Sequence, residues 1–392
     1  MHVTHVFHSY HPALGGMERV VQKLAEEQSR MGHEVHAVTS TLWSEDEPRC
    51  ETVNSVRVDR VRAFRLHYPD LAYPLNGSQD VLRNSDVVHV HSQNSLFNVA
   101  IAKRAKKIGK PIVMEFLAVD YLSSHTNPLI KLLGGFYQQR IQSQAAKLAD
   151  YAITLNERDH TTLKRKYGLE SKIVPHGIDE KYLKEPRDDS LFREKHGVPS
   201  RNIIAYVGRA HPSKGLDTLI KALPIVEREV DDFAVVIAGS GSRFYVRRLN
   251  TLAKRLKVDR RINLLGYIGE AEKMALLDSS KIFVFPTRHF GEAYPLVVDE
   301  AHARDVPVVA TKVGTLPCRI KHMETGLLVP PDDPSTLAKA IISLLKNHDL
   351  IDSIRERLRT AKRSLLTWGQ VCERLDSVYN DVRQSARQGT TP

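Results

Sequence analysis

Cysteine is scarce in this chain of 392 residues: Cys50, Cys318 and Cys372 lie far apart, and no Cys-x-x-Cys pair occurs. An odd, scattered set of this kind argues against a disulfide framework and a cysteine-based zinc site, so we expect a reduced, cytoplasmic compartment. Long apolar runs are also missing, which excludes an ordinary transmembrane helix. The first residues lack the basic and apolar regions of a signal peptide.

Acidic residues are fewer than basic ones, with 46 Asp and Glu against 57 Lys and Arg and a formal net charge of +11. The excess is uneven: residues 1–190 contain 25 basic and 23 acidic residues, whereas residues 191–392 contain 32 and 23. A positive surplus favours an anionic partner. On charge alone, that partner is a nucleotide phosphate, an anionic lipid or a nucleic acid.

The chain does contain a regular alternation of short β-branched runs with amphipathic helical stretches. The expected strands are residues 3–7, 34–39, 86–91, 111–116, 203–207, 233–238, 282–285 and 306–310. A charged, turn-rich stretch at 180–195 separates the two sets of four and is the most linker-like segment. The pattern predicts an α/β fold in two halves, each a parallel sheet covered by helices.

The segment Gly208-Arg209-Ala-His-Pro-Ser-Lys214-Gly215 follows an expected strand and opens a helix. A helix N-terminus presents free N–H groups and partial positive charge, which suit a phosphate. Arg209 and Lys214 add full charges that can reach a diphosphate. The alternative interpretation is a strand-to-helix turn whose basic residues are simply solvated.

A second segment, Phe290-Gly-Glu292-Ala-Tyr-Pro-Leu-Val-Val-Asp-Glu300, places two carboxylates around an expected helix start near Pro295. Glu292 would then precede the helix, with Glu300 about one and a half turns inside it. One carboxylate can face a sugar and the other a ribose. The alternative is two unrelated surface glutamates.

Two glycine pairs follow expected strands. Gly15 and Gly16 permit close backbone approach to a phosphate, because no Cβ intervenes; the alternative is an ordinary turn before a helix. Gly239-Ser-Gly241 only partly matches the dinucleotide fingerprint, since Phe244 replaces its third glycine. We expect a strand-to-helix turn there, bordering the bound ligand.

Together, Pro12-Ala-Leu-Gly15-Gly16-Met-Glu18, Gly208–Gly215 and Glu292-x7-Glu300 resemble the retaining GT-B-fold glycosyltransferases often called glycosyl transferases group 1. The resemblance spans nearly the whole chain. It implies two Rossmann-like domains facing a cleft. They would be an acceptor-side domain at 1–183 and a nucleotide-sugar-binding domain at 190–367, with a helix at 368–386 crossing back to the first domain and a flexible tail at 387–392.

The resemblance also implies roles for individual residues. Arg209 and Lys214 would meet the diphosphate, Glu292 the sugar hydroxyls and Glu300 the ribose, while Glu18 supports a helix start. The implied catalytic residues are Arg209, Lys214 and Glu292. The implied donor-binding residues are Gly15, Gly16, Arg209, Lys214, Glu292, Leu296, Val297 and Glu300. Leu296 and Val297 would bind through their backbone amides.

No Asp-x-Asp triplet occurs, so the metal–diphosphate motif of the other large glycosyltransferase fold is missing. We therefore expect a metal-independent hexosyltransferase with no cofactor and no nucleic-acid partner. Its donor would be a UDP- or GDP-sugar, and its acceptor a glycan, a lipid-linked group or a small molecule. The base, the sugar, the acceptor and the linkage stay open.

Histidines number 18, with groups at His5, His8 and His11 and at His89 and His91. His89 and His91 would point to the same face of a strand. A zinc site needs three or four convergent ligands with supporting hydrogen bonds, which spacing alone cannot establish. We expect structural or cleft-lining histidines.

One position departs from the family pattern. Many relatives have a histidine that touches the reacting sugar where this chain has Leu117. His91 and Asp120 are the acceptor-side candidates to replace it, with Glu115 as a further possibility if the register shifts.

A basic run comprises Lys103, Arg104, Lys106, Lys107 and Lys110. The apolar segment 128–137 follows it in sequence. Together they could dock on an anionic membrane that presents a lipid acceptor, making the protein peripheral. The alternative is a solvated helix end followed by an ordinary core-facing helix.

Three other functions compete with sugar transfer. A nucleotide-sugar epimerase needs extra acid–base groups at the sugar, and no secure set is present. A non-catalytic sugar-nucleotide-binding subunit fits Leu117 but not the retained charged residues. A nicotinamide-dependent oxidoreductase is disfavoured by the incomplete glycine fingerprint. Release of free nucleotide diphosphate from a panel of sugar nucleotides would separate these functions.

Overall fold

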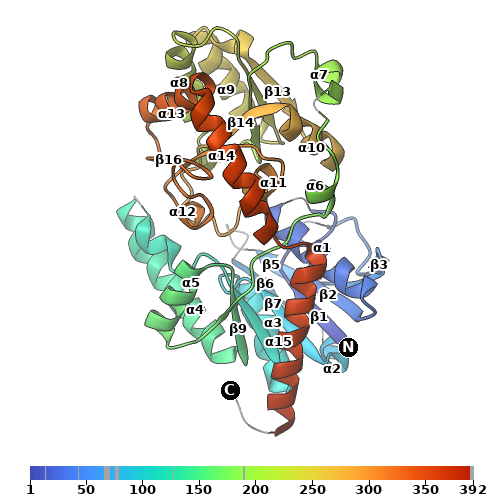
Figure 1. Ribbon diagram of the computed structural model, residues 1–392. Helices are drawn as coiled ribbons and strands as arrows, with labels where there is room; N and C mark the ends of the chain where they lie inside the picture. Colours follow the sequence, from blue (N-terminus) through green and yellow to red (C-terminus); the bar gives the residue numbers. More distant parts are fainter. Residues whose placement is uncertain are drawn as a thin grey trace. The chain divides into compact units, whose positions relative to one another are not determined.

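The computed structural model describes residues 1–13, 15–42, 44–65, 71–75, 79–125, 127–188 and 190–388. The chain divides into two compact units (Figure 1). Unit 1 consists of Met1–Gly177 and Leu366–Pro392, and unit 2 consists of Ile178–Leu365. Each unit is an α/β domain built on a largely parallel sheet, which confirms the expected fold class.

The main sheet of unit 1 has, among the described residues, the strand order β10-β9-β8-β7-β1-β2-β4-β3, and only β3 pairs in the antiparallel sense. Its strands are β1 (His2–Val6), β2 (Glu34–Ser40), β3 (Cys50–Val53), β4 (Val56–Val61), β7 (Val87–His91), β8 (Ile112–Phe116), β9 (Tyr151–Thr154) and β10 (Lys172–Ile173); β5 (Ala63–Arg65) and β6 (Ala72–Pro74) form a separate ribbon.

Helices cover both faces of this sheet, so its central strands are buried on both sides. They are α1 (Gly16–Arg30), α2 (Gln79–Asn84), α3 (Leu96–Lys107), α4 (Gly135–Leu148) and α5 (Glu157–Tyr167), with a 3₁₀ turn η2 (Tyr121–Ser124) and a π-helical turn η3 (Ile130–Gly134). Val88 and Val90 pack in an apolar cluster with Phe97 and Ile101 of α3. His89 and His91 alternate with these valines and therefore face the other side.

The final helix, α15 (Trp368–Gln388), belongs to unit 1 although unit 2 precedes it in the chain. Its buried residues recur at three- and four-residue intervals: Val371, Cys372, Leu375, Val378, Tyr379 and Val382. This apolar stripe packs on α1, where Gln28 Nε2 donates to the Tyr379 hydroxyl at 3.1 Å. The expected return helix is therefore present. Residues 389–392 of the expected tail lie outside the described part of the chain.

The sheet of unit 2 is parallel throughout its described strands, in the order β13-β12-β11-β14-β15-β16. These are β11 (Ile203–Val207), β12 (Ala234–Ala238), β13 (Ile262–Gly266), β14 (Ser280–Phe285), β15 (Val308–Thr311) and β16 (Gly326–Val329). The strand order reverses between β11 and β14. In open α/β sheets, ligands bind outside the carboxyl ends of the strands at such a reversal.

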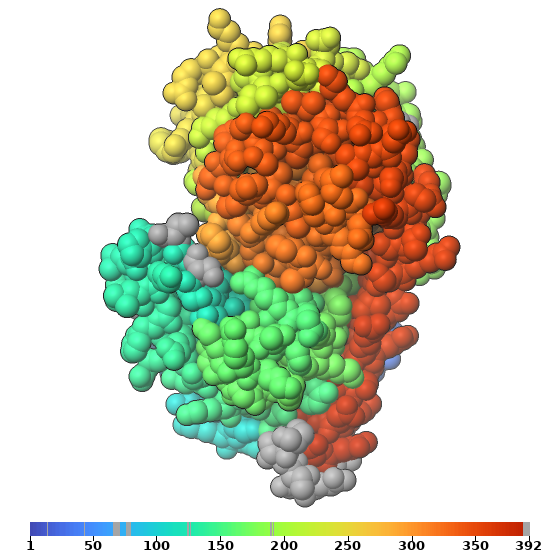
Figure 2. Space-filling model, turned by 60° about the vertical axis from the view of Figure 1, so that its left-hand side comes forward, coloured from blue at the N-terminus to red at the C-terminus, as the bar shows by residue number. Residues whose placement is uncertain are grey.

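Helices also cover both faces of the unit 2 sheet. They are α6 (Lys181–Lys184), α7 (Ser190–His196), α8 (Leu216–Glu227), α9 (Arg243–Arg255), α10 (Glu270–Ser279), α11 (Leu296–Ala303), α12 (Leu316–Arg319), α13 (Pro334–Lys346) and α14 (His348–Ala361), with short 3₁₀ turns η4 (Pro212–Lys214), η5 (Asp259–Arg261) and η6 (Lys362–Ser364). In Figure 2, α13 and α14, in orange to red, form the surface of unit 2 that faces the viewer.

The stretch 180–195, expected to be a linker, contributes instead to the core of unit 2. Tyr182 in α6 and Phe192 in α7 are both buried there. Arg304 clamps the segment between them by donating to the carbonyl of Glu185 at 2.7 Å and to that of Pro186 at 3.0 Å. The chain therefore changes unit at Gly177/Ile178, before the expected boundary, because two aromatic anchors lie among the charged residues.

Candidate active site

The loop between β11 and α8 carries the expected phosphate-binding segment. Gly208 (φ +154°) and Gly215 (φ +70°) both adopt backbone conformations that favour glycine. A Cβ at Gly215 would come within 1.9 Å of the Pro286 carbonyl oxygen, so the loops after β11 and β14 approach each other closely.

The loop after β12 packs against the same segment. A Cβ on Gly239 (φ +135°) would lie 1.9 Å from the Gly208 carbonyl oxygen, and Ala210 N donates to Ser240 O at 2.8 Å. Backbone-to-backbone packing is therefore a sufficient reason for glycine at 239. This loop lies beside the candidate phosphate site, as the expected strand-to-helix turn.

Lys214 and Glu292 meet at the strand reversal, one from the loop after β11 and the other from the loop after β14. Lys214 Nζ forms an ion pair with Glu292 Oε1, and the two side chains are only 13% and 9% exposed. The ammonium group also lies 5.4 Å from the centre of the Phe285 ring. A largely buried ion pair is poorly screened by solvent, so each charge strongly orients the other.

Glu292 is held rigidly by its neighbours. Thr287 Oγ1 donates to Glu292 Oε1 at 3.0 Å, and both the amide and the hydroxyl of Thr315 donate to the Glu292 carbonyl at 3.0 Å. Gly314 (φ +55°) allows this approach, since a Cβ there would lie 2.6 Å from the same carbonyl. The carboxylate is therefore preorganised before any ligand arrives.

Arg209, by contrast, is exposed and makes no side-chain hydrogen bond or ion pair within the described part of the chain. Its backbone is fixed, because the Tyr206 hydroxyl donates to the Arg209 carbonyl at 3.0 Å. The pKa of the neighbouring His211 is lowered by partial burial and by the charges of Arg209 and Lys214. The loop therefore presents positive charge that nearby acidic groups only partly neutralise.

Helix α11 begins at Leu296, with Pro295 at its N-cap. The amides of Leu296 and Val297 are in the first turn, where an α-helix offers no intrahelical acceptor. Both side chains are half-buried. These amides can therefore receive an anion, as expected for a donor diphosphate.

Glu300 is buried inside α11, where it forms an ion pair with a lysine of α10. Lys273 Nζ of α10 lies 2.6 Å from Glu300 Oε2 and 3.2 Å from Glu270 Oε1. Lys273 was missed from the sequence, and so were Thr287 and Thr315. Lys273 lies one helical turn before Leu276 and Leu277 and therefore on the same, buried face of its helix. A lysine at such a position is the signal that could have revealed it.

Gly15 and Gly16 belong to unit 1, where they lead into α1. Gly15 has an extended backbone (φ −170°) that any residue adopts, and the Glu18 carboxylate lies over it. No atom lies within 4 Å of the position that a Cβ on Gly16 would take. Packing within the protein therefore does not require glycine at position 16. The space beside this residue is open to a ligand.

The two acceptor-side candidates are not joined to each other. His91 is fully buried, with hydrogen bonds to Glu115 and His5. Asp120 forms an ion pair with Lys166. No hydrogen bond or ion pair connects His91 with Asp120 in the described structure, so they do not form one group.

Leu117, at the departure from the family pattern, is buried and held in place. Its amide and carbonyl each form a 2.8 Å hydrogen bond with the Gln93 side chain. The loop that follows is strained, because Ala118 (φ +45°) and Asp120 (φ +59°) are left-handed without being glycine. Strain of this kind clusters at functional sites. Asp120 thus stays the better acceptor-side candidate, whereas His91 is shielded from solvent.

Two protein families match the chain in succession. Residues 14–182 match the family described as Glycosyltransferase Family 4, and residues 188–364 match the one described as Glycosyl transferases group 1. The matches meet near the boundary between the two units. They cover the Gly15–Gly16 turn and the unit 2 site residues from Gly208 to Thr315.

Characterised relatives are similar at modest identity. N-acetyl-alpha-D-glucosaminyl L-malate synthase of Bacillus anthracis is 25% identical over 387 residues, covering 97% of each chain. GDP-mannose-dependent alpha-(1-6)-phosphatidylinositol monomannoside mannosyltransferase of Mycobacterium tuberculosis is 31% identical over 184 residues, which are 45% of this chain and 47% of that protein.

Solved structures of glycosyltransferases share the fold. Sucrose-phosphate synthase from Thermosynechococcus elongatus superposes with a TM-score of 0.79 at 20% identity, covering 98% of this chain and 99% of that one. Anabaena HepE in complex with UDP-glucose gives a TM-score of 0.76 at 18% identity, covering 97% and 100%. At such identities the likeness concerns the fold alone.

Proposed function

Since this chain belongs to the glycosyl transferases group 1 and is a glycosyltransferase, we propose that it moves a hexose from a nucleotide-diphosphate sugar to an acceptor with retention of configuration. The observation that carries this proposal is the Lys214–Glu292 pair beside the unpaired Arg209, at the strand reversal of unit 2. The site combines fixed positive charge with a fixed carboxylate, which a sugar diphosphate requires.

Arg209 and Lys214 stabilise the leaving group in this proposal. As the bond between the anomeric carbon and the phosphate oxygen breaks, negative charge builds on the diphosphate, and preorganised cations lower the energy of that state. Lys214 then turns from Glu292 to the phosphate. Glu292 is freed to accept hydrogen bonds from the sugar hydroxyls.

Retention follows if the acceptor attacks on the same face that the diphosphate leaves. The acceptor oxygen forms a bond to the anomeric carbon, the bond to the phosphate oxygen breaks, and the acceptor proton passes to the departing phosphate. No protein nucleophile is needed. This assignment draws on the family resemblance, because no side chain of the site is a secure nucleophile or base.

Other elements of each unit would also bind the donor. In unit 2, the amides of Leu296 and Val297 suit the phosphates, and Glu300 would accept from the ribose hydroxyls. In unit 1, the open backbone at Gly16 also suits a phosphate. One relative is a GDP-mannose-dependent mannosyltransferase, and one solved structure with the same fold contains UDP-glucose. The donor in our proposal is therefore a UDP-sugar or a GDP-sugar.

The direct test is a panel of UDP- and GDP-sugars incubated with the protein and candidate acceptors, with release of free nucleotide diphosphate as the readout. We expect one donor to be consumed with stoichiometric product. Sugar interconversion without nucleotide release would indicate an epimerase, and tight binding without turnover a non-catalytic subunit. Reduction of a nicotinamide cofactor would indicate an oxidoreductase.

We also propose that the transfer step needs no exchangeable divalent cation and no cofactor, because Arg209 and Lys214 supply the charge that a metal would otherwise provide. Activity should survive an excess of EDTA. Complete loss that Mg²⁺ or Mn²⁺ restores would contradict this proposal, since these ions bind diphosphates through oxygen.

A lipid-linked acceptor is the form we favour, because unit 1 exposes an apolar segment. Leu129, Leu132, Leu133 and Phe136 are 62%, 71%, 62% and 64% exposed, on η3 and the start of α4 (Figure 2, turquoise). The interpretation of this segment as an ordinary core-facing helix is therefore wrong. Exposed apolar patches mark interaction surfaces, and an interfacial helix of this kind suits the headgroup region of a bilayer.

The basic run does not share this face. The basic run lies at the end of α3, near the point where strand β8 begins. The apolar segment comes after the end of β8, and therefore lies at the opposite end of the strands. Arg104 donates to the Pro74 carbonyl at 2.8 Å, and Lys106 pairs with Asp150. The expectation of one combined docking surface is thus wrong in its geometry. Membrane contact, on the cytoplasmic face in our proposal, would rest on the apolar segment and on Lys131 within it.

Liposome flotation tests this part of the proposal. Replacing Leu132, Leu133 and Phe136 by serine should abolish binding to vesicles with anionic lipid. Replacing Lys103 and Lys107 by glutamine is the matched control and should change binding little. Equal binding of all three proteins, or none, would favour a soluble acceptor. None of the described helices is long and apolar enough to cross a bilayer.

A further inference from the structure

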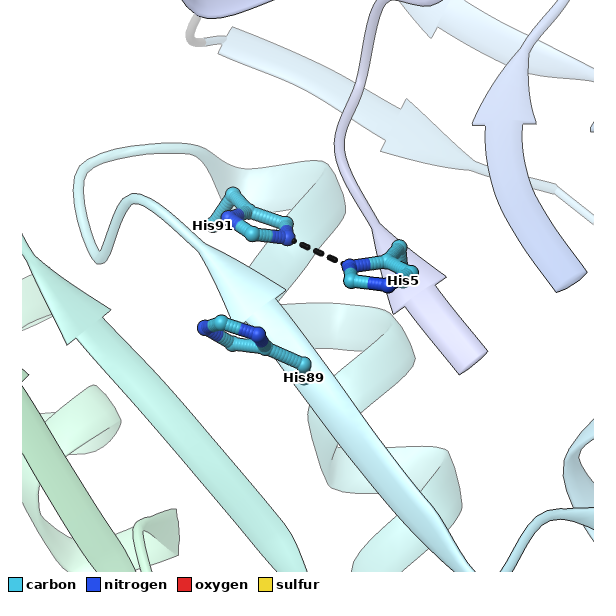
Figure 3. A group of neighbouring side chains, drawn as sticks. All are labelled: His5, His89 and His91. Atoms are coloured by element: carbon cyan, nitrogen blue, oxygen red, sulfur yellow. Dashed lines mark hydrogen bonds between the residues drawn. The ribbon is translucent and has the colours of Figure 1, made fainter. Parts of the chain in front are cut away.

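Three histidine side chains meet in the core of unit 1. His5 lies on β1, and His89 and His91 lie on the neighbouring strand β7, with His5 and His89 directly paired in register. All three point to the same face of the sheet and are buried (Figure 3). Helices α1 and α15 supply Gln28 and Tyr379 on that side.

The rings are close enough to share one small ligand. One nitrogen from each histidine lies within 4.8 Å of the other two. His5 Nδ1 and His91 Nε2 are 2.8 Å apart, as the dashed line in Figure 3 shows. His89 and His91 have ring centres 4.1 Å apart. Three imidazole nitrogens that converge in this way are the ligand set of many zinc sites.

The outward nitrogens of the three rings each have an oxygen partner. A metal-bound histidine usually donates its other N–H to an oxygen, which fixes the ring and its tautomer. All three contacts of this kind are present at 2.8 Å: His5 Nε2 with Gln28 Oε1, His89 Nδ1 with the Tyr379 hydroxyl, and His91 Nδ1 with Glu115 Oε2.

The other nitrogen of each ring is less well satisfied. His89 Nε2 is buried and has no hydrogen-bond partner in the described structure. His5 Nδ1 and His91 Nε2 have only each other. Buried polar atoms are normally paired, so an unpaired one needs a reason. A bound cation would give His5 Nδ1 and His91 Nε2 a shared partner in place of each other.

We propose that His5, His89 and His91 each give one ring nitrogen to a single divalent transition-metal ion, zinc in the first instance, in the core of unit 1. Imidazole ligands suit zinc, whereas Mg²⁺ and Ca²⁺ prefer oxygen. Tetrahedral zinc–nitrogen bonds of about 2.0–2.1 Å place ligand nitrogens roughly 3.4 Å apart. On binding, the rings would turn to bring their nitrogens from within 4.8 Å to that spacing, which leaves the fourth position for a water molecule.

A carboxylate lies directly behind the cluster. Glu115 Oε2 is 2.8 Å from His91 Nδ1, whereas the other nitrogen of that ring contacts His5. A negative charge in this position favours a bound cation.

Such an ion would link β1 and β7 directly, and α1 and α15 through Gln28 and Tyr379. It is separate from the transfer chemistry, which we assign to unit 2 without a metal. The sequence spacing favoured purely structural histidines, because it could not show that oxygen partners surround all three rings.

The test is the zinc content of tag-free protein that has been stripped with a strong chelator, incubated with Zn²⁺ and desalted. Wild type should retain about one zinc per chain, as a single site requires. His89→Gln should retain almost none. His302→Gln, which replaces a buried histidine of unit 2, is the matched control and should retain as much as wild type.

Two further measurements keep the test decisive if His89→Gln fails to fold. The wild-type protein reloaded with Co²⁺ should show the visible absorption of a tetrahedral, nitrogen-ligated ion. Tyr379→Phe, which removes the hydroxyl that His89 and Gln28 both contact, should bind Zn²⁺ roughly tenfold more weakly. Wild type that retains no zinc and shows no cobalt bands would overturn the proposal. Zinc retention by a folded His89→Gln variant equal to that of wild type would overturn it too.

Discussion

Each unit places a cluster of charged or titratable groups beside its central strands, and the two clusters differ in how far they are closed. In unit 2, Lys214 and Glu292 remain slightly exposed and Arg209 has no partner in the described structure. In unit 1, His5, His91 and Glu115 are fully buried and bonded to one another. An open cluster can exchange internal partners for a ligand. A closed one holds its own domain together, or an ion inside it.

The largest effect should come from removing an unpaired charge of the open cluster. Arg209→Ala should lower kcat by on the order of a hundredfold, because the guanidinium stabilises a leaving group whose charge grows in the transition state. Steady-state kinetics with the identified donor would measure it. Arg255→Ala, an exposed arginine at the far end of α9, should leave kcat unchanged. A purely KM effect of Arg209→Ala would contradict the leaving-group role.

The closed cluster should instead respond in stability. Glu115→Gln removes the charge that His91 and His176 contact at 2.8 and 2.7 Å, so the free energy of unfolding should fall by about 2 kcal/mol. Urea denaturation measures this loss. The folded variant should keep most of its kcat. A large loss of kcat with unchanged stability would show that Glu115 acts on substrate.

Lowering the pH should reduce the stability of the two units to different extents, and this effect should be smaller and more gradual. Among the described residues, burial strongly lowers the pKa of His5, His8 and His89 in unit 1 and of His302 in unit 2. The pKa is about 3 for His5 and about 4 for His8 and His302. Below pH 6.5 the unfolded chain binds protons that these folded rings refuse, so stability falls as pH falls.

Each such histidine contributes up to about 1.4 kcal/mol per pH unit between its unfolded and folded pKa. Unit 1 should therefore lose stability more steeply than unit 2 between pH 6.5 and about 4. Hydrogen exchange by mass spectrometry, corrected for the intrinsic pH dependence, would follow both units in one sample. Equal losses in the two units would contradict the comparison.

The smallest effect should come from the glycine turn of unit 1. Gly16→Ala meets no atom within 4 Å, so the fold should keep its stability, while the donor KM should rise by about fivefold, or ~1 kcal/mol, if a phosphate approaches there. Gly135→Ala, at an equally open helical position, is the control. Unchanged donor KM for both variants would leave Gly16 as an ordinary turn glycine.

The unit 2 site was predictable because its residues lie in short motifs at the ends of apolar strands. Arg209 and Lys214 follow β11 directly, and Glu292 and Glu300 flank the start of α11. Parallel strands end at one sheet edge, so the motifs of adjacent strands necessarily come together. The return helix was expected from the family resemblance, and the structure adds the buried stripe that holds it in unit 1.

The unit 1 cluster was not predictable, because its contacts join distant parts of the sequence. His89 meets Tyr379 across 290 positions, and His5 meets His91 across 86. Spacing shows which side chains share a strand face but not which helix covers that face. The same limit hid Lys273, whose charge on an apolar helix face is explained only by the facing Glu300.

The buried aromatics of 180–195 were misjudged from composition, because a charged run suggested a linker. For the apolar segment near Leu132, composition left two interpretations open, an exposed docking surface and a core-facing helix. In each case the surrounding tertiary structure decides, since burial depends on what packs against the segment.

The central claim is that Lys214 exchanges Glu292 for the leaving diphosphate, and single-turnover transfer by Lys214→Ala tests it most directly. Donor-saturated enzyme, mixed rapidly with acceptor, reports the chemical step alone. Our account predicts a rate on the order of a hundredfold below wild type, with Lys221→Ala, an exposed lysine of α8, unchanged. A Lys214→Ala rate equal to wild type under donor saturation would contradict the account.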